Sequence, residues 1–189
     1  LVGSTLAGLG PGALVATGSV RRRAQLAAHR PDLTFAGLRG NIATRLAQVG
    51  RVDAVLVALA ALHRLGYEPS DVLDPSVMLP QVGQGALAVE CRADDEATRA
   101  LLATIEHRPT RRAVDAERAF LSRLGGGCDL PVGGFATIAG NGMVELTGVL
   151  ASNDGRVVMR HAARGTDPVM VGDEVGGVLA RAGAALAAP

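Results

Sequence analysis

Short apolar runs alternate with helical patterns over the first third of the chain. The alternation predicts strands at residues 13–16, 33–36 and 54–59, and helices at residues 20–30, 42–49 and 62–65. The first helix would bury a stripe made of Val20, Ala24, Ala27 and Ala28. Strands and helices that alternate at this spacing are typical of a parallel sheet with helices on both faces. We therefore predict a doubly wound α/β domain.

The chain changes character after residue 66. Residues 67–82 contain three prolines and little periodicity, so we expect a crossing segment there rather than a packed element. Residues 86–91 predict a strand in which Cys91 is a buried small side chain. Acidic residues at 94–96 suit a helix N-terminus. That helix would bury Leu101, Leu102 and Ile105.

From residue 110 onward the pattern predicts an α+β region. Thr110 is a candidate cap for a helix that ends at the glycines of residues 125–127. Asn141-Gly142 and Asp154-Gly155 are strong hairpin signals. They predict a three-stranded antiparallel sheet from residues 133–139, 143–151 and 156–163, and a last helix follows at residues 169–187.

Composition narrows the class of protein. A chain of 189 residues that is 48% hydrophobic can bury a sizeable core. Its aromatic content of 2% argues against a nucleic-acid module that stacks bases on aromatic side chains. No apolar run reaches membrane-spanning length, so we expect no membrane contact. Two cysteines fit a reducing compartment, and we expect a cytoplasmic protein.

Basic residues are unevenly distributed along the chain. All 19 residues of the Lys and Arg class are arginine. The first 64 residues hold eight of these arginines and two of the 18 acidic residues. A GC-rich genome would explain arginine without lysine, and an anion-binding surface would explain the excess of positive charge near the start. Composition alone leaves both explanations open.

Arginines gather at the predicted start of the first helix. Ser19 is a natural N-cap, and Arg21 and Arg22 lie in the first helical turn. Each cation at a helix N-terminus destabilises the helix by about 0.3–1 kcal/mol, because it interacts unfavourably with the helix dipole. A bound anion would offset this cost, because the backbone N–H groups and the guanidinium groups would both donate to it. A solvated run of arginines is the alternative.

The second predicted helix repeats this arrangement. Asn41 is a plausible cap, with Arg39 before it and Arg45 on the next turn. In a parallel sheet, the loops that follow successive strands open at one edge, so these arginines and Arg64 are expected around one crevice. Arginine suits carboxylates and phosphates, since its planar fork can donate two parallel hydrogen bonds. The sequence therefore predicts a polyanion site.

Cys128 and the histidines are the remaining candidates for chemistry. Cys128 follows three glycines in a loop, where it is either an accessible functional thiol or an incidental one. The residues alone leave both readings open. The four histidines lack the spacing of metal ligands, so we expect no metal site.

Several of these stretches resemble the porphobilinogen deaminase family, also called hydroxymethylbilane synthase. The resemblance is carried, in matching order and spacing, by Thr17-Gly18-Ser19-Val20-Arg21-Arg22, Leu38-Arg39-Gly40-Asn41, Thr44-Arg45-Leu46, residues 79–86 and Gly126-Gly127-Cys128. It extends over nearly the whole chain.

The resemblance implies a fold and a domain plan. Family members have two domains of periplasmic-binding-protein type around a cleft and a small third α+β domain. By this resemblance, residues 1–85 would form a cleft domain, residues 86–107 would return to the family's first domain, and residues 108–189 would form the cofactor-carrying domain. The first domain has no counterpart here, so we expect this chain to be part of a longer protein. We also expect residues 86–104 to leave an apolar face uncovered.

The resemblance also implies an activity in tetrapyrrole (heme) biosynthesis. Family members are transferases that join four porphobilinogen units into hydroxymethylbilane and release ammonia, using a dipyrromethane cofactor bound to a cysteine. By motif position, Cys128 would attach this cofactor. Ser19, Arg21 and Arg22 would bind its carboxylates, whereas Arg39, Arg45, Arg64 and Gln84 would bind porphobilinogen or the growing chain.

The missing domain limits what the resemblance implies. It carries the family's catalytic acid, so we assign no catalytic residue to this chain and expect no turnover from it alone. The complete protein would be a monomer. Two alternatives remain: an anion-binding module without catalysis, in which Cys128 has no role, and a nucleic-acid binder that uses the basic first 64 residues.

Overall fold

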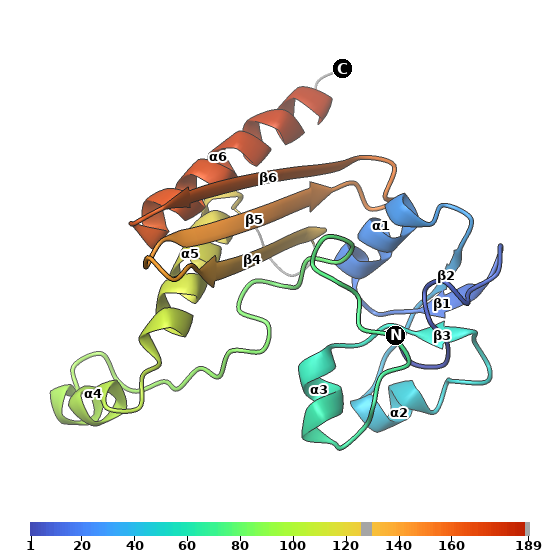
Figure 1. Ribbon diagram of the computed structural model, residues 1–189, viewed down its shortest axis with the longest axis horizontal. Helices are drawn as coiled ribbons and strands as arrows, with labels where there is room; N and C mark the ends of the chain where they lie inside the picture. The colour runs from blue at the N-terminus through green and yellow to red at the C-terminus, as the bar shows by residue number, and fades with distance from the viewer. Residues whose placement is uncertain (126–129, 188–189) are drawn as a thin grey trace. The chain divides into compact units, whose positions relative to one another are not determined.

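The structure is a computed structural model that describes residues 1–125 and 130–187 (Figure 1). It divides into two compact units. The first unit contains Leu1–Leu79 and the hairpin segment Val149–Met159, and most of the remaining chain forms the second. Of the helices within the described residues, none has the length and apolar character needed to cross a membrane.

The first unit is built around a parallel sheet. The strands are β1 (Leu14–Ala16), β2 (Thr34–Ala36) and β3 (Ala54–Val55), in the order β2-β1-β3, and both pairs are parallel. The helices are α1 (Val20–His29), α2 (Ile42–Leu46) and α3 (Leu59–Arg64). The predicted alternation is confirmed. β3 is shorter than predicted, because β1 ends at Ala16 and offers no further ladder partner.

Both faces of this sheet are covered by apolar side chains. Val15 packs into one cluster with Leu26 and Leu56, whereas Ala16 packs into another with Leu38 and Leu62. This alternation is expected for a parallel sheet buried on both faces.

The buried stripe predicted for α1 is wrong in part. Ala24 is buried, but Val20 and Ala28 are exposed, and the buried face of α1 consists instead of Arg21, Ala24, Gln25 and Leu26. Two polar residues can lie on this face because distant backbone groups accept or donate hydrogen bonds there, as shown below.

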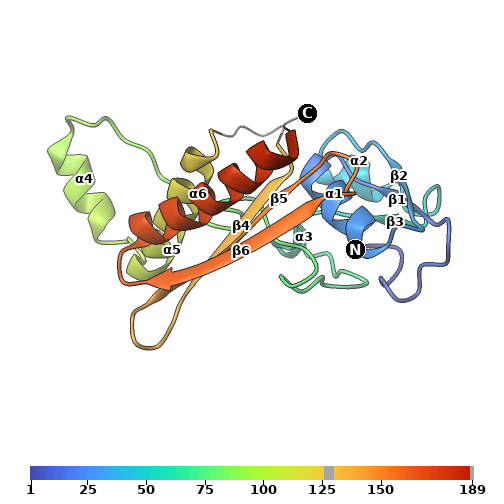
Figure 2. The same ribbon diagram turned by 90° about the horizontal axis from the view of Figure 1, so that it is seen from above.

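The second predicted sheet is confirmed. Its strands are β4 (Val132–Ile138), β5 (Val144–Ala151) and β6 (Val158–Gly165), in the order β4-β5-β6 and with alternating directions (Figure 1). Two helices, α5 (Arg108–Arg123) and α6 (Pro168–Ala187), lie side by side against it (Figures 1 and 2). His107 caps α5 rather than Thr110: its side chain accepts a hydrogen bond from the backbone N–H of Thr110.

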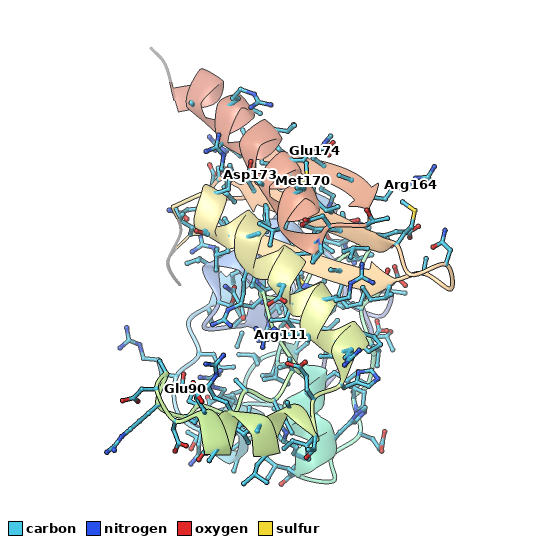
Figure 3. The ribbon with its side chains drawn as sticks, turned by 90° about the vertical axis from the view of Figure 1, so that its left-hand side faces the viewer. Glu90, Arg111, Arg164, Met170, Asp173 and Glu174 are labelled. Carbon is cyan, nitrogen blue, oxygen red and sulfur yellow. The ribbon has the colours of Figure 1, made fainter. Side chains whose placement is uncertain are left out.

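Close contacts hold α5, α6 and the sheet together. A Cβ placed on Gly148 of β5 would lie 2.7 Å from Val175 of α6 and 2.8 Å from Phe120 of α5. Asp173 of α6 lies beside α5, where it pairs with Arg123 at 3.5 Å, whereas Met170 and Glu174 are exposed on α6 (Figure 3). The core of this unit therefore lies between two helices and one sheet face.

The strand predicted at residues 86–91 is wrong. The structure has no strand in this described stretch, and Cys91 is exposed rather than buried. The next helix, α4 (Glu96–Ala103), does form and is capped by Asp95, but it buries none of its residues. Leu87 and Leu101 are 84% and 70% exposed. A strand needs a ladder partner and an apolar face needs a covering surface, and the described residues supply neither to this stretch. The stretch therefore leaves an apolar face uncovered, as the family resemblance implied.

Candidate anion-binding site

Two capped helix N-termini lie at the carboxyl edge of the parallel sheet. Ser19 caps α1, where its Oγ accepts a hydrogen bond from the backbone N–H of Arg22 at 3.4 Å. Asn41 caps α2, where its Oδ1 accepts from the backbone N–H of Thr44 at 2.9 Å. Both predicted caps are confirmed. Since α1 follows β1 and α2 follows the neighbouring β2, the two helices begin at one edge of the sheet.

The loops that lead into these helices touch each other. A Cβ on Gly18 would lie 2.3 Å from the backbone oxygen of Leu38, so a side chain has no room at this position. The loop before Ser19 is thus in backbone contact with the loop that carries Arg39.

We predict that Gly18→Ala lowers the free energy of unfolding by about 1–3 kcal/mol, because the added methyl group would force the two loops apart. Urea denaturation measures the change. Gly10→Ala is the matched control, since a Cβ there has no neighbour within 4 Å among the described residues. Equal losses in the two variants would contradict the contact.

Arg21 and Arg22 differ in their surroundings. Arg21 is 3% exposed, and its Nη1 donates a hydrogen bond to the backbone oxygen of Leu79. Burial, and then the charge of Arg22, lower the pKa of Arg21 to about 10. Arg22 is half-buried, and its Nη1 donates to the backbone oxygen of Leu56 at 3.4 Å, just beyond β3. Arg22 therefore reaches from the end of β1 to the end of β3.

Arg22 and Arg45 lie near enough to repel each other. Burial, followed by the positive charge of Arg45, lowers the pKa of Arg22 below its usual value. The Nε of Arg45 also donates to the backbone oxygen of Gly40 at 2.8 Å, so its side chain folds back over the loop that carries Arg39. An anion between Arg22 and Arg45 would relieve this repulsion.

Three further predicted site residues are exposed. Arg39 is exposed in the loop before α2, and Arg64 is exposed in the last turn of α3. Gln84 belongs to the second unit, where it is exposed in a turn and its backbone N–H donates to Gln81. Cys128 lies outside the described residues.

Sequence reasoning missed a buried carboxylate, Glu117 on α5. Its Oε2 accepts a hydrogen bond from the backbone N–H of Gly83 at 2.7 Å, and its Oε1 accepts from that of Ala136 at 2.9 Å. Glu117 thereby holds the glycine turn that carries Gln84 against β4. Burial raises its pKa above the usual value. The sequence signal that could have revealed it is an acidic residue beside the apolar stripe of α5, between Ala116 and Phe120.

Comparison with known families accounts for both units. Residues 1–100 match the family model described as "Porphobilinogen deaminase, dipyromethane cofactor binding domain", and residues 111–181 match "Porphobilinogen deaminase, C-terminal domain". Together these matches cover most of the chain.

Curated proteins called porphobilinogen deaminase are similar along almost the whole chain. The protein of Brevibacillus brevis is 47% identical over 186 residues, which are 96% of this chain and 60% of that protein. The protein of Geobacillus kaustophilus is 46% identical over 184 residues, which are 95% of this chain and 59% of that protein. The protein of Roseiflexus sp. is 48% identical over 176 residues, which are 90% of this chain and 57% of that protein.

The chain thus spans about 60% of the length of the curated relatives it matches. The resemblance carried by the arginine-bearing motifs is confirmed by two family models that follow one another along the chain. The chain belongs to the porphobilinogen deaminase family.

Proposed function

We propose that the complete protein is a transferase of tetrapyrrole biosynthesis that joins four porphobilinogen units into hydroxymethylbilane and releases ammonia. Membership of the family supports this proposal. The observation that carries it is that the charge of Arg45, in the last turn of α2, lowers the pKa of Arg22, in the first turn of α1, where two cations could share one anion.

The described residues fit a chain of pyrroles that carry carboxylates. Each porphobilinogen unit brings two carboxylates, and the site offers guanidinium groups and the hydroxyl of Ser19. A charge-assisted hydrogen bond shielded from water contributes about 1.5–3 kcal/mol. Ser19, Arg21 and Arg22 would bind the carboxylates of a dipyrromethane, and Arg39, Arg45, Arg64 and Gln84 would bind those of porphobilinogen or the growing chain.

These residues would bind and orient rather than react. The dipyrromethane, when attached to Cys128, supplies the pyrrole end to which further units are joined. Arg22 and Arg45 would fix carboxylates on neighbouring rings, which holds the reacting ends in one orientation. The positive charge of Arg45 beside Arg22 would favour the binding of an anion between them.

The domain plan is part of the same proposal. Residues 1–85 would form a doubly wound cleft domain of periplasmic-binding-protein type, residues 86–107 would return to a further domain, and residues 108–189 would carry the cofactor. We further propose that the complete protein is a monomer of the cytoplasm and binds neither nucleic acid nor membrane.

An anion-binding module without catalysis is the less favoured alternative. The match to a cofactor-binding domain is followed by a match to the family's C-terminal domain, which such a module would not need.

Mass spectrometry under denaturing conditions tests the attachment to Cys128. We expect the chain, produced together with the N-terminal domain of a relative, to carry the added mass of a dipyrromethane. Cys128→Ser should lose this added mass completely. Cys91→Ser is the matched control and should keep it, because Cys91 is an exposed thiol with no assigned role. An unmodified parent protein, or an adduct that persists in Cys128→Ser, would contradict the proposal.

A further inference from the structure

Gln25 on α1 has a buried side-chain amide that forms hydrogen bonds with both the backbone N–H and the backbone oxygen of Leu79. Its side chain is buried, and the residue is 2% exposed. Its Oε1 accepts a hydrogen bond from the backbone N–H of Leu79 at 2.9 Å, and its Nε2 donates to the backbone oxygen of Leu79 at 3.1 Å. The amide therefore fixes the Leu79 backbone as a neighbouring strand would.

The same carbonyl group of Leu79 also accepts a hydrogen bond from Nη1 of Arg21. Arg21 and Gln25 are one helical turn apart on α1, so their side chains leave the same face of the helix. The Nε2 of Gln25 also lies 3.5 Å from the backbone oxygen of Arg21, which ties the two residues together locally. Two side chains of α1 thus converge on a single buried oxygen.

A buried guanidinium group lies where hydrogen-bond acceptors hold it, because leaving such a group unpaired in the interior is costly. The place of the Leu79 oxygen therefore helps to set the place of the Arg21 guanidinium. The amide of Gln25 accepts from the N–H of Leu79 and donates to its oxygen at the same time. A glutamate could accept but not donate, and a methionine would fill the space without an N–H donor or a strong acceptor.

We infer that Gln25 is a positioning residue for Arg21: by fixing the Leu79 backbone, it sets where the Arg21 guanidinium lies beside Arg22. Nothing in the family's matched motifs assigns this role to Gln25. The geometric part of the inference stands on the structure, whereas its consequence for ligand binding rests on the proposed function.

The geometric part is tested without ligand, by NMR of the arginine guanidinium N–H groups, the Nη groups included, in the 189-residue chain, because Nη1 of Arg21 is the donor to Leu79. The Arg21 signal is assigned from its loss in Arg21→Lys. We expect Gln25→Glu and Gln25→Met to move the Arg21 signal and to speed its hydrogen exchange about tenfold or more, as the guanidinium loses its fixed acceptor. Gln48→Glu and Gln48→Met are matched controls, since Gln48 lies in the same unit after α2, and should leave the signal unchanged.

Titration of the same samples with a free dipyrromethane that carries carboxylate side chains tests the consequence, because Ser19, Arg21 and Arg22 are the residues proposed to bind those carboxylates. In folded Gln25→Met, we expect the dissociation constant to rise about tenfold, the change that accompanies loss of one charge-assisted hydrogen bond. If Gln25 had a purely structural role, its substitution would lower the free energy of unfolding but leave the Arg21 signal and the affinity of the folded molecules unchanged.

The outcomes separate the two proposals. If the dipyrromethane moves no arginine signal in the parent chain and no adduct forms on Cys128, the proposed function fails, while the ligand-free result still decides the role of Gln25. An unchanged Arg21 signal in either folded variant overturns the inference. If neither Gln25 variant folds, Gln25 is a core residue only, and the inference is likewise overturned.

Discussion

Glu117→Leu is expected to lower the free energy of unfolding by about 3–5 kcal/mol, because the buried N–H of Ala136 and the partly buried N–H of Gly83 would lose their acceptor at once. Glu117 is 6% exposed, and both of its carboxylate oxygens accept backbone hydrogen bonds, from Gly83 and Ala136. Leucine would fill the space without accepting either bond. Urea denaturation followed by circular dichroism measures the loss.

The control for this substitution is Glu174→Leu on the exposed side of α6 (Figure 3). It should change the free energy of unfolding by no more than about 0.5 kcal/mol. If the two variants lost equal stability, the buried hydrogen bonds of Glu117 would not be the cause.

The effect of Glu117 should also depend on pH. Burial raises the pKa of Glu117 above its usual 4.5, so the folded chain binds this proton more tightly than the unfolded chain. The stability that this group contributes through proton binding is full below pH 4.5 and is lost as the pH rises through the raised pKa. The free energy of unfolding of the parent chain should therefore exceed that of Glu117→Leu by more at pH 4 than at about pH 7. If this difference in the free energy of unfolding grew with rising pH, the pKa of Glu117 would be lowered by folding and not raised.

Replacing glycine with alanine should have opposite effects at two positions of α6. In an exposed helix, this substitution stabilises by about 0.8–1 kcal/mol. A Cβ on Gly172, however, would lie 2.3 Å from the backbone oxygen of Ala116 and 2.6 Å from the Cβ of Ala119. Gly172→Ala would therefore push α6 away from α5, and we expect it to lower the free energy of unfolding by about 2–4 kcal/mol.

Gly177→Ala is the matched control for Gly172→Ala. A Cβ on Gly177 would meet only the ends of flexible arginine side chains, at 3.4 Å and 3.7 Å. We expect this variant to gain about 0.5–1 kcal/mol from helix propensity. Thermal and urea denaturation of both variants measure the signs, and a gain in stability at Gly172 would refute the close packing of α5 on α6.

Local signals predicted most of the fold. The turns Asn141-Gly142 and Asp154-Gly155 set the second sheet, because these dipeptides favour the tight turns of hairpins. The alternation of strand and helix likewise gave the parallel sheet. The caps Ser19 and Asn41 were readable because a capping side chain bonds to its own helix. The turns and the caps involve residues only a few positions apart, whereas the parallel strands, which pair Leu14 with Thr34, were recognised by their apolar pattern and not by their partners.

What the sequence did not predict depends on distant partners. Gln25 and Arg21 are buried because Leu79, more than 50 residues away, supplies the hydrogen bonds. Glu117 pairs with Gly83 and Ala136, which lie 34 and 19 residues away. A pattern of apolar positions contains no information about such partners, so the polar residues were assigned to the wrong face or missed. The strand predicted at residues 86–91 failed for the related reason that no described strand lies beside it.

The uncovered segment around α4 bears on the fate of the chain in a cell. Leu87, Val89, Leu101 and Ile105 are exposed although both units are folded. Uncovered apolar side chains are what chaperones bind, and an extended backbone is what proteases cut. Degradation of any copy in which this segment is uncovered would then begin there, without unfolding of either unit. A partner that covers it during synthesis would raise the abundance of the chain while leaving the free energy of unfolding of each unit unchanged.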